Sequence, residues 1–255
     1  MASQRDNCII LLVEPPLPER LDPEFINAFG AERAIHIHLD LLQNAYKLAK
    51  NFKDSVLFLS FGKSPRHPDL TWLDAEDPGF LDAKGKSPED RIMEAFQLAF
   101  NTGAKKALLL SHLAPDVKPE WLYQAFDSVT ERTVTLGLNQ DGSVYLLGLT
   151  INNLKILDLK ACPSGLFFRS AKIADEITER ARKNKLGIFS LPGACAVTNE
   201  EALRKWLDGR NAAPSLFQAP AGALPALPEE KKHGRRGHRT AAPGQPLPDT
   251  ELKPL

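Results

Sequence analysis

The chain of 255 residues is long enough for one large α/β domain or for two small ones. Its 32 basic and 32 acidic side chains balance, so no global field favours nucleic acid or an anionic membrane as a partner. The longest apolar run, Cys8 to Val13, is far too short to span a bilayer. No signal-peptide pattern opens the chain, and its three cysteines show no metal-type pairing, so we expect a cytoplasmic protein.

Strand and helix patterns alternate from residue 1 to residue 210. Continuous apolar runs predict strands that are covered on both faces, helical spacing of apolar residues predicts helices, and capping residues such as Ser87 and Thr198 mark helix starts. The predicted strands cover residues 8–13, 55–61, 106–111, 133–138, 144–150 and 187–191. The predicted helices cover residues 32–52, 87–103, 119–129, 171–185 and 198–207.

A turn with Asp141 and Gly142 joins two of the predicted strands. An Asp-Gly pair between apolar runs is a strong signal for an antiparallel reversal. The alternation as a whole predicts a three-layer α/β sandwich with a mixed, mostly parallel sheet. Ligands of such open sheets bind outside the carboxyl ends of the strands. A site is therefore expected after Val13, after Ser111 and at the Asp141 turn.

Residues 211–255 have a different composition. They carry eight prolines, four glycines, one aromatic residue (Phe217) and a basic cluster from Lys231 to Arg239. Such a segment buries too little apolar surface to offset its chain entropy, so we predict a disordered tail that follows a domain of residues 1–210. The basic cluster could hold a protein partner by charge, and a solvated tail without a partner is the alternative.

Segments with consistent order and spacing resemble those of a known family. Asp141 to Leu149 (DGSVYLLGL) is similar to its signature DGGYYLIGL, and Leu108 to Pro115 (LLLSHLAP) is similar to a strand that ends in GSDCP. Pro88 to Phe96 (PEDRIMEAF) resembles LGERM followed by a helix. The family is that of bacterial nucleotide-diphospho-sugar transferases of the arsenosugar-biosynthesis type. The resemblance implies a glycosyltransferase A-type, Rossmann-like domain, a nucleotide-sugar substrate and a divalent metal such as Mn²⁺ or Mg²⁺.

The resemblance also assigns residues to the diphosphate and the metal. The Asp of GSDCP would be the natural ligand, but its place is taken by Leu113, which cannot coordinate a metal, so we predict no metal ligand there. His112 beside it is weighed as a substrate or metal contact, or as a structural residue. Arg20 and Arg91 match basic residues of the family and could contact phosphate. Arg91 could equally form a local ion pair at the start of its helix.

Around the turn, the resemblance implies a catalytic role for Asp141 near the sugar or acceptor, with Gly142 and Tyr145 as substrate-binding residues of the signature. Asp141 could instead be retained as a good turn former. Ser143 replaces the second Gly of the family, which makes the backbone less permissive. Cys195 stands where the family has an acid, and no motif supplies a base that would activate its thiol.

The leading interpretation is a glycosyltransferase-like protein with a degenerate metal and diphosphate site, and the sequence leaves open whether it is an enzyme. The alternative is a non-catalytic binding or scaffold domain that uses the same fold. A nucleotidyltransferase is a third possibility, but it would need a Gly-rich basic loop after the first strand, and Glu14 to Leu21 contains no such loop.

Overall fold

Strands and helices alternate along the described part of the chain. The computed structural model describes residues 6–14, 16–18, 21–62, 70–74, 81–83, 88–159 and 171–212. The strands are β1 (Asn7–Val13), β2 (Val56–Gly62), β3 (Leu81–Ala83), β4 (Lys106–Leu110), β5 (Thr133–Leu138), β6 (Val144–Leu149) and β7 (Gly187–Ser190). The helices are α1 (Pro23–Phe29), α2 (Ala31–Asn51), α3 (Pro88–Asn101), α4 (Pro119–Ser128), α5 (Ile151–Leu157), α6 (Ala171–Lys183) and α7 (Glu200–Ala212).

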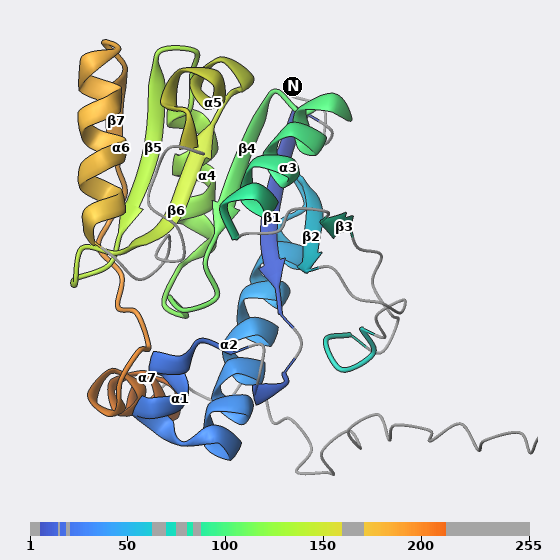
Figure 1. Ribbon diagram of the computed structural model, residues 1–255, viewed down its shortest axis with the longest axis vertical. Coiled ribbons are helices and arrows are strands. Elements are labelled where there is room, and N and C mark those ends of the chain that lie inside the picture. The colour runs from blue at the N-terminus through green and yellow to red at the C-terminus, as the bar shows by residue number, and fades with distance from the viewer. Residues whose placement is uncertain are drawn as a thin grey trace, which may run out of the picture. The chain divides into compact units, whose positions relative to one another are not determined.

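The described strands form one mixed sheet in the order β3-β2-β1-β4-β6-β5-β7. Strand β6 runs antiparallel to its neighbours β4 and β5, whereas every other pairing in the sheet is parallel. The reversal occurs at the Asp141 turn, where Gly142 has a φ of 83° that favours glycine. The prediction of a mixed, mostly parallel sheet is confirmed (Figure 1).

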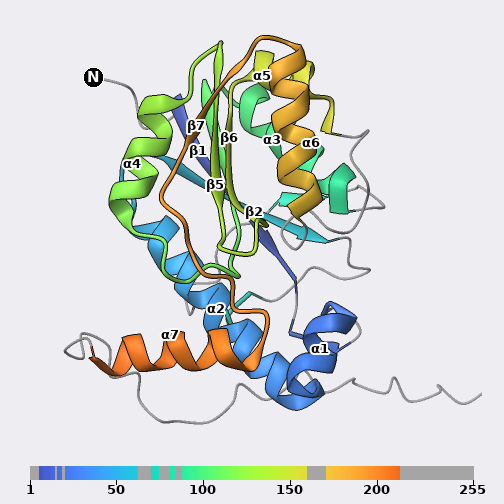
Figure 2. The same cartoon turned by 90° about the vertical axis from the view of Figure 1, so that its left-hand side faces the viewer.

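Helices cover both faces of this sheet. Helices α2 and α4 lie on one face, and α3, α5 and α6 lie on the other (Figure 2). Neighbouring residues of β1 show the division, because successive side chains of a strand point to opposite faces. Ile9 packs in a cluster with Phe126 of α4, and Ile10 packs in a cluster with Phe96 of α3. The three-layer α/β sandwich is therefore confirmed.

A further apolar cluster, which we call the cap cluster, joins α1, the first half of α2 and α7. It includes Phe25, Leu41, Leu113 and Trp206. These helices lie beyond the carboxyl ends of the parallel strands (Figures 1 and 2). The cap cluster thus brings helices from both ends of the described chain to the edge at which the sequence places a site.

Some elements differ from the sequence prediction. Helix α1 was not predicted, because seven residues are too few to establish a helical period. It starts after the N-cap residue Asp22, whose carboxylate accepts a hydrogen bond from the backbone N–H of Glu24. Helix α5 was also missed, although Thr150 caps it in the same way. Helix α7 continues to Ala212, past the predicted domain boundary at residue 210.

Two further predictions concern residues that the structure does not describe. Arg20 lies outside the described residues, and so does the tail beyond residue 212, including its basic cluster and any role of that cluster in partner binding. Among the described helices, none is both long enough and apolar enough to cross a membrane.

Candidate functional site

The strand order reverses between β1 and β4. The chain extends the sheet from β1 through β2 to β3 on one side, and later adds β4 on the other side of β1. Ligands of open α/β sheets bind outside the carboxyl ends of the strands at such a point. The residues that follow β1 and β4 therefore line the expected binding position.

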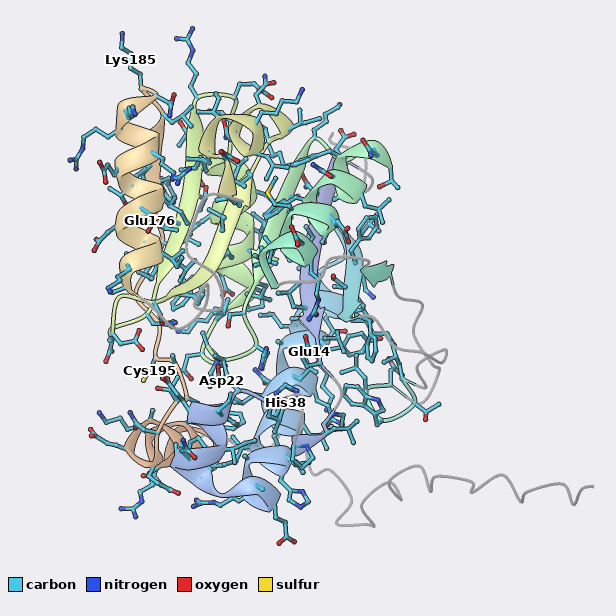
Figure 3. All side chains as sticks on the ribbon, in the orientation of Figure 1. Glu14, Asp22, His38, Glu176, Lys185 and Cys195 are labelled. Atoms are coloured by element: carbon cyan, nitrogen blue, oxygen red, sulfur yellow. The ribbon has the colours of Figure 1, made fainter. Side chains whose placement is uncertain are left out.

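Four polar side chains from four elements lie there, and we call them the switch-point cluster: Glu14 after β1, His112 after β4, His38 of α2 and Arg91 of α3. Arg91 Nη1 donates to Glu14 Oε1. His38 Nε2 donates to the backbone carbonyl of Glu14 at 3.1 Å. The rings of His38 and His112 meet edge to face, with centroids 4.9 Å apart. Figure 3 shows Glu14 and His38 next to each other beyond the end of β1.

Glu14 is the centre of this cluster because elements from both faces of the sheet bind it. Its backbone is held by His38 from the α2 face, and its carboxylate is held by Arg91 from the α3 face. The Glu14 side chain is 26% exposed and so reachable from solvent, whereas the Nε and Nη2 atoms of Arg91 are buried.

Arg91 is buried and only partly satisfied. The residue is 9% exposed, and its Nε and Nη2 atoms have no hydrogen-bond partner in the described structure. Leaving a buried donor unpaired costs about 1–3 kcal/mol, and more for a charged group. Arg91 also lies in the first turn of α3, where the backbone N–H groups and the helix dipole favour an anion. A negatively charged acceptor would form hydrogen bonds with the unpaired Nε and Nη2 donors of Arg91.

Asp141 is held by its own turn. Its Oδ1 accepts from the backbone N–H of Ser143 at 2.9 Å and from the Ser143 hydroxyl at 2.6 Å. The residue is exposed, and no donor among the described residues contacts Oδ2. The turn lies two strand spacings from β1, which is about 10 Å. The structure therefore places Asp141 on the same edge as the switch-point cluster, but not within it.

Tyr145 and Gly142, the other two signature residues, are both held by contacts within the fold. The Tyr145 side chain is fully buried, its hydroxyl donates to the Pro192 carbonyl at 2.7 Å, and burial raises its pKa. A substrate would not reach it without rearrangement of the core. At Gly142, an added Cβ would lie 2.8 Å from the Cβ of Ala171, so this glycine is required by its φ and by its neighbour.

The residues at the expected metal position do not fit a divalent cation. Leu113 is 3% exposed and packs in the cap cluster, and its carbonyl accepts from the Val197 N–H at 2.8 Å. Its side chain thus belongs to the apolar contact between β4 and the cap helices. Among the described residues, no three His, Cys, Asp or Glu side chains are grouped so that they could hold a metal ion.

Cys195 lies near the Asp141 turn, because the segment after β7 returns beside it through the bridge between Asn139 and Ala194. Burial raises the pKa of the Cys195 thiol, and the negative charge of Asp116 adds to this effect. A raised pKa keeps the thiol protonated at neutral pH, so the surroundings do not activate it as a nucleophile.

Sequence reasoning missed two members of the switch-point cluster. His38 lies on the buried side of its helix and is 4% exposed, so its position in the sequence gave no sign of a site. Glu14 directly follows the strand whose end was predicted to face a ligand, so its position was the available signal. Arg91 and His112 were predicted as substrate-binding residues, and the structure brings them to the same edge.

Comparisons with known proteins bear on the fold. A family model described as "Uncharacterized protein conserved in bacteria (DUF2064)" matches residues 47–165, which is just under half of the chain. A solved structure from Desulfovibrio desulfuricans G20, assigned as a nucleotide-diphospho-sugar transferase, superposes with a TM-score of 0.66 at 18% identity and covers 82% of this chain and 89% of its own. The resemblance drawn from the sequence is confirmed at the level of the fold.

Another solved structure has a similar fold. A nucleotidyl transferase from Methanothermobacter superposes with a TM-score of 0.52 at 9% identity, covering 80% of this chain and 96% of its own. The comparison with curated proteins found no match. The likeness to solved structures therefore defines the fold, and the chemistry has to be argued from the residues of this chain.

Proposed function

We propose that the protein binds a nucleotide-diphospho-sugar at the carboxyl edge of its sheet and acts as a glycosyltransferase-like protein with a reduced site. The observation that carries the proposal is the switch-point cluster, in which the buried Arg91 offers two unpaired donors at the strand-order reversal. The transferase-like fold and the sequence signature around Asp141 support the same substrate class.

The switch-point cluster and the Asp141 turn lie at different positions along the carboxyl edge of the sheet, and they define the proposed orientation of the nucleotide-sugar. The diphosphate lies at the switch-point cluster, because Arg91 is the arginine of that cluster and has two unpaired donors. The sugar or the acceptor extends toward Asp141, whose Oδ2 is available to accept from a hydroxyl. Arg20 keeps its proposed role at the phosphate, and we assign His112 to the same group.

Transfer on such a site would break the bond between the anomeric carbon and the diphosphate oxygen. The acceptor oxygen would form the new bond to that carbon, and the acceptor proton would go to a base, for which Asp141 is the candidate. The leaving nucleoside diphosphate would carry away the electron pair, and positive groups must stabilise the developing charge.

Calorimetric titration with uridine and guanosine diphospho-sugars, with and without Mn²⁺, tests the proposal. We expect at least one of these donors to bind. We expect Asp141→Asn to lower the rate at which transfer releases the nucleoside diphosphate by a larger factor than it raises the Kd of the donor. Absence of binding for every donor under both conditions would contradict the proposed function. Lys105→Gln, which removes an exposed ion pair with Asp6 at the far edge, is the control.

A further inference from the structure

A diphosphate bound at the proposed position needs a positive charge that neutralises its negative charge. In proteins of this substrate class either a divalent metal held by carboxylates or basic side chains can do so. Position 113, where the resembled family has an acid, carries a leucine that is 3% exposed and packs in the cap cluster. The side chain that would hold a cation is therefore replaced by an apolar contact.

Arg91 supplies a charge in the same region. Its guanidinium is held on one side by Glu14, and its Nε and Nη2 atoms remain buried and unpaired in the described structure. The fork of Nε and Nη2 is the arrangement that binds two oxygens of a phosphate at once. The N-terminal turn of α3, to which Arg91 belongs, adds the backbone N–H groups that follow Pro88, which has none itself.

We infer that Arg91 and the first turn of α3 form a phosphate subsite that holds the diphosphate without a divalent cation. Glu14 acts as a positioning residue: it occupies Nη1 and so leaves the Nε and Nη2 donors for the ligand. This inference rests on the proposed function, from which it takes the diphosphate as ligand, and it adds that the binding energy comes from the protein rather than from a metal bridge.

The role of Glu14 leads to a specific expectation for its variants. A glutamine at position 14 keeps an acceptor for Arg91 Nη1 and removes a negative charge near the phosphate. An alanine removes the acceptor and frees the guanidinium to rotate. Glu14→Gln should therefore bind diphosphate at least as tightly as the wild-type protein, and Glu14→Ala should bind it more weakly. A residue that only stabilised the fold would not separate the two variants in this way.

The test is calorimetric titration of the full-length protein in buffer with EDTA, using inorganic pyrophosphate, uridine diphosphate, guanosine diphosphate and the two nucleosides without phosphate. We expect pyrophosphate and the diphosphates to bind in EDTA, the nucleosides to bind much more weakly, and Mn²⁺ to change the Kd less than about threefold. Arg91→Gln should weaken diphosphate binding by about 10- to 100-fold, which is the range for a lost hydrogen bond to a charged group. Arg91→Lys should lie between, because ammonium lacks the fork.

Arg33→Gln is the matched control, because Arg33 also pairs with a glutamate, Glu200, but does so on the exposed side of the cap helices. It should bind diphosphate like the wild-type protein. If Arg91→Gln does not fold, the thermal midpoint of the wild-type protein provides the second measurement, and it should rise with pyrophosphate in EDTA.

The outcomes separate this inference from the proposed function. Binding of nucleotide-sugars that requires Mn²⁺ and is unchanged in Arg91→Gln would overturn the cation-independent subsite and leave the proposed function standing. Pyrophosphate binding that depends on Arg91, with no binding of any nucleotide-sugar, would overturn the proposed function and support the subsite. Failure of every phosphate ligand to bind would overturn both.

Discussion

Replacing Leu113 by aspartate tests whether position 113 belongs to the apolar cap or to a metal site. The substitution restores the acid of the resembled family at a position that is 3% exposed. Loss of the buried leucine side chain costs about 1.5–3 kcal/mol. A polar group left without a partner in its place costs about 1–3 kcal/mol more. The expected loss of about 2.5–6 kcal/mol is a large part of the total stability of about 5–15 kcal/mol for a typical domain.

The pH dependence separates the charge from the loss of packing. Burial among apolar side chains raises the pKa of a carboxyl group, so the folded state of Leu113→Asp prefers the protonated form. Its stability is therefore highest below the pKa of the unfolded chain, about 3.9, and decreases as the pH rises through the raised pKa of the folded state. Leu113→Asn has a similar size without this titration, so the gap between the two variants should widen from pH 5 to pH 8.

Urea denaturation followed by tryptophan fluorescence measures these differences. Trp206 is 7% exposed and belongs to the same cluster as Leu113, so one of the chain's three tryptophans lies in the cap. Leu113→Met preserves the volume and should cost less than about 1.5 kcal/mol. The reasoning would be refuted if Leu113→Asp were as stable as Leu113→Met, or if Mn²⁺ raised the urea midpoint of Leu113→Asp alone, since the carboxylate would then reach a cation.

Three further predictions concern the core. An alanine at Gly137 would place its Cβ 2.5 Å from the Tyr145 ring, so thermal denaturation should show a loss of about 1–3 kcal/mol; the double variant with Tyr145→Leu should recover part of it, and additivity of the two changes would argue against the contact. Burial raises the pKa of Tyr46 to about 12, and it raises the pKa of Tyr145 as well; their stabilisation is present below pH 10 and is lost as the pH rises through the raised values. Phenolate absorbance of the folded protein should thus lag behind that of the guanidinium-unfolded protein, and coincident curves would contradict the burial. Burial also raises the pKa of the Cys8 thiol to about 12; mass spectrometry should therefore find it unmodified after iodoacetamide treatment of the folded protein at pH 8, whereas rapid labelling would show that β1 opens.

The fold could largely be predicted because its elements have strong local signals. The strand from Cys8 to Val13 is a continuous apolar run, and the Asp141 turn combines an Asp-Gly pair with apolar runs on both sides. The short helices α1 and α5 were missed because seven residues give no reliable period, and their helical state depends on capping and packing.

The site could be predicted only in part. The edge of the sheet followed from the strand pattern, and Arg91 and His112 were named. Sequence resemblance alone also implied Tyr145 as a substrate contact, but it could not reveal that this side chain is fully buried. The role of Glu14 was invisible because its partners, His38 and Arg91, are 24 and 77 positions away in the chain.

The sequence by itself determined the alternation of the longer strands and helices and the reversal at Asp141, because each of these depends on residues that are near one another in the chain. Only the tertiary structure decided that Arg91 is buried with unpaired donors beside Glu14, and that Leu113 packs against the cap helices. Contacts of this kind depend on the order of strands in the sheet, which places the ends of β1 and β4 next to each other.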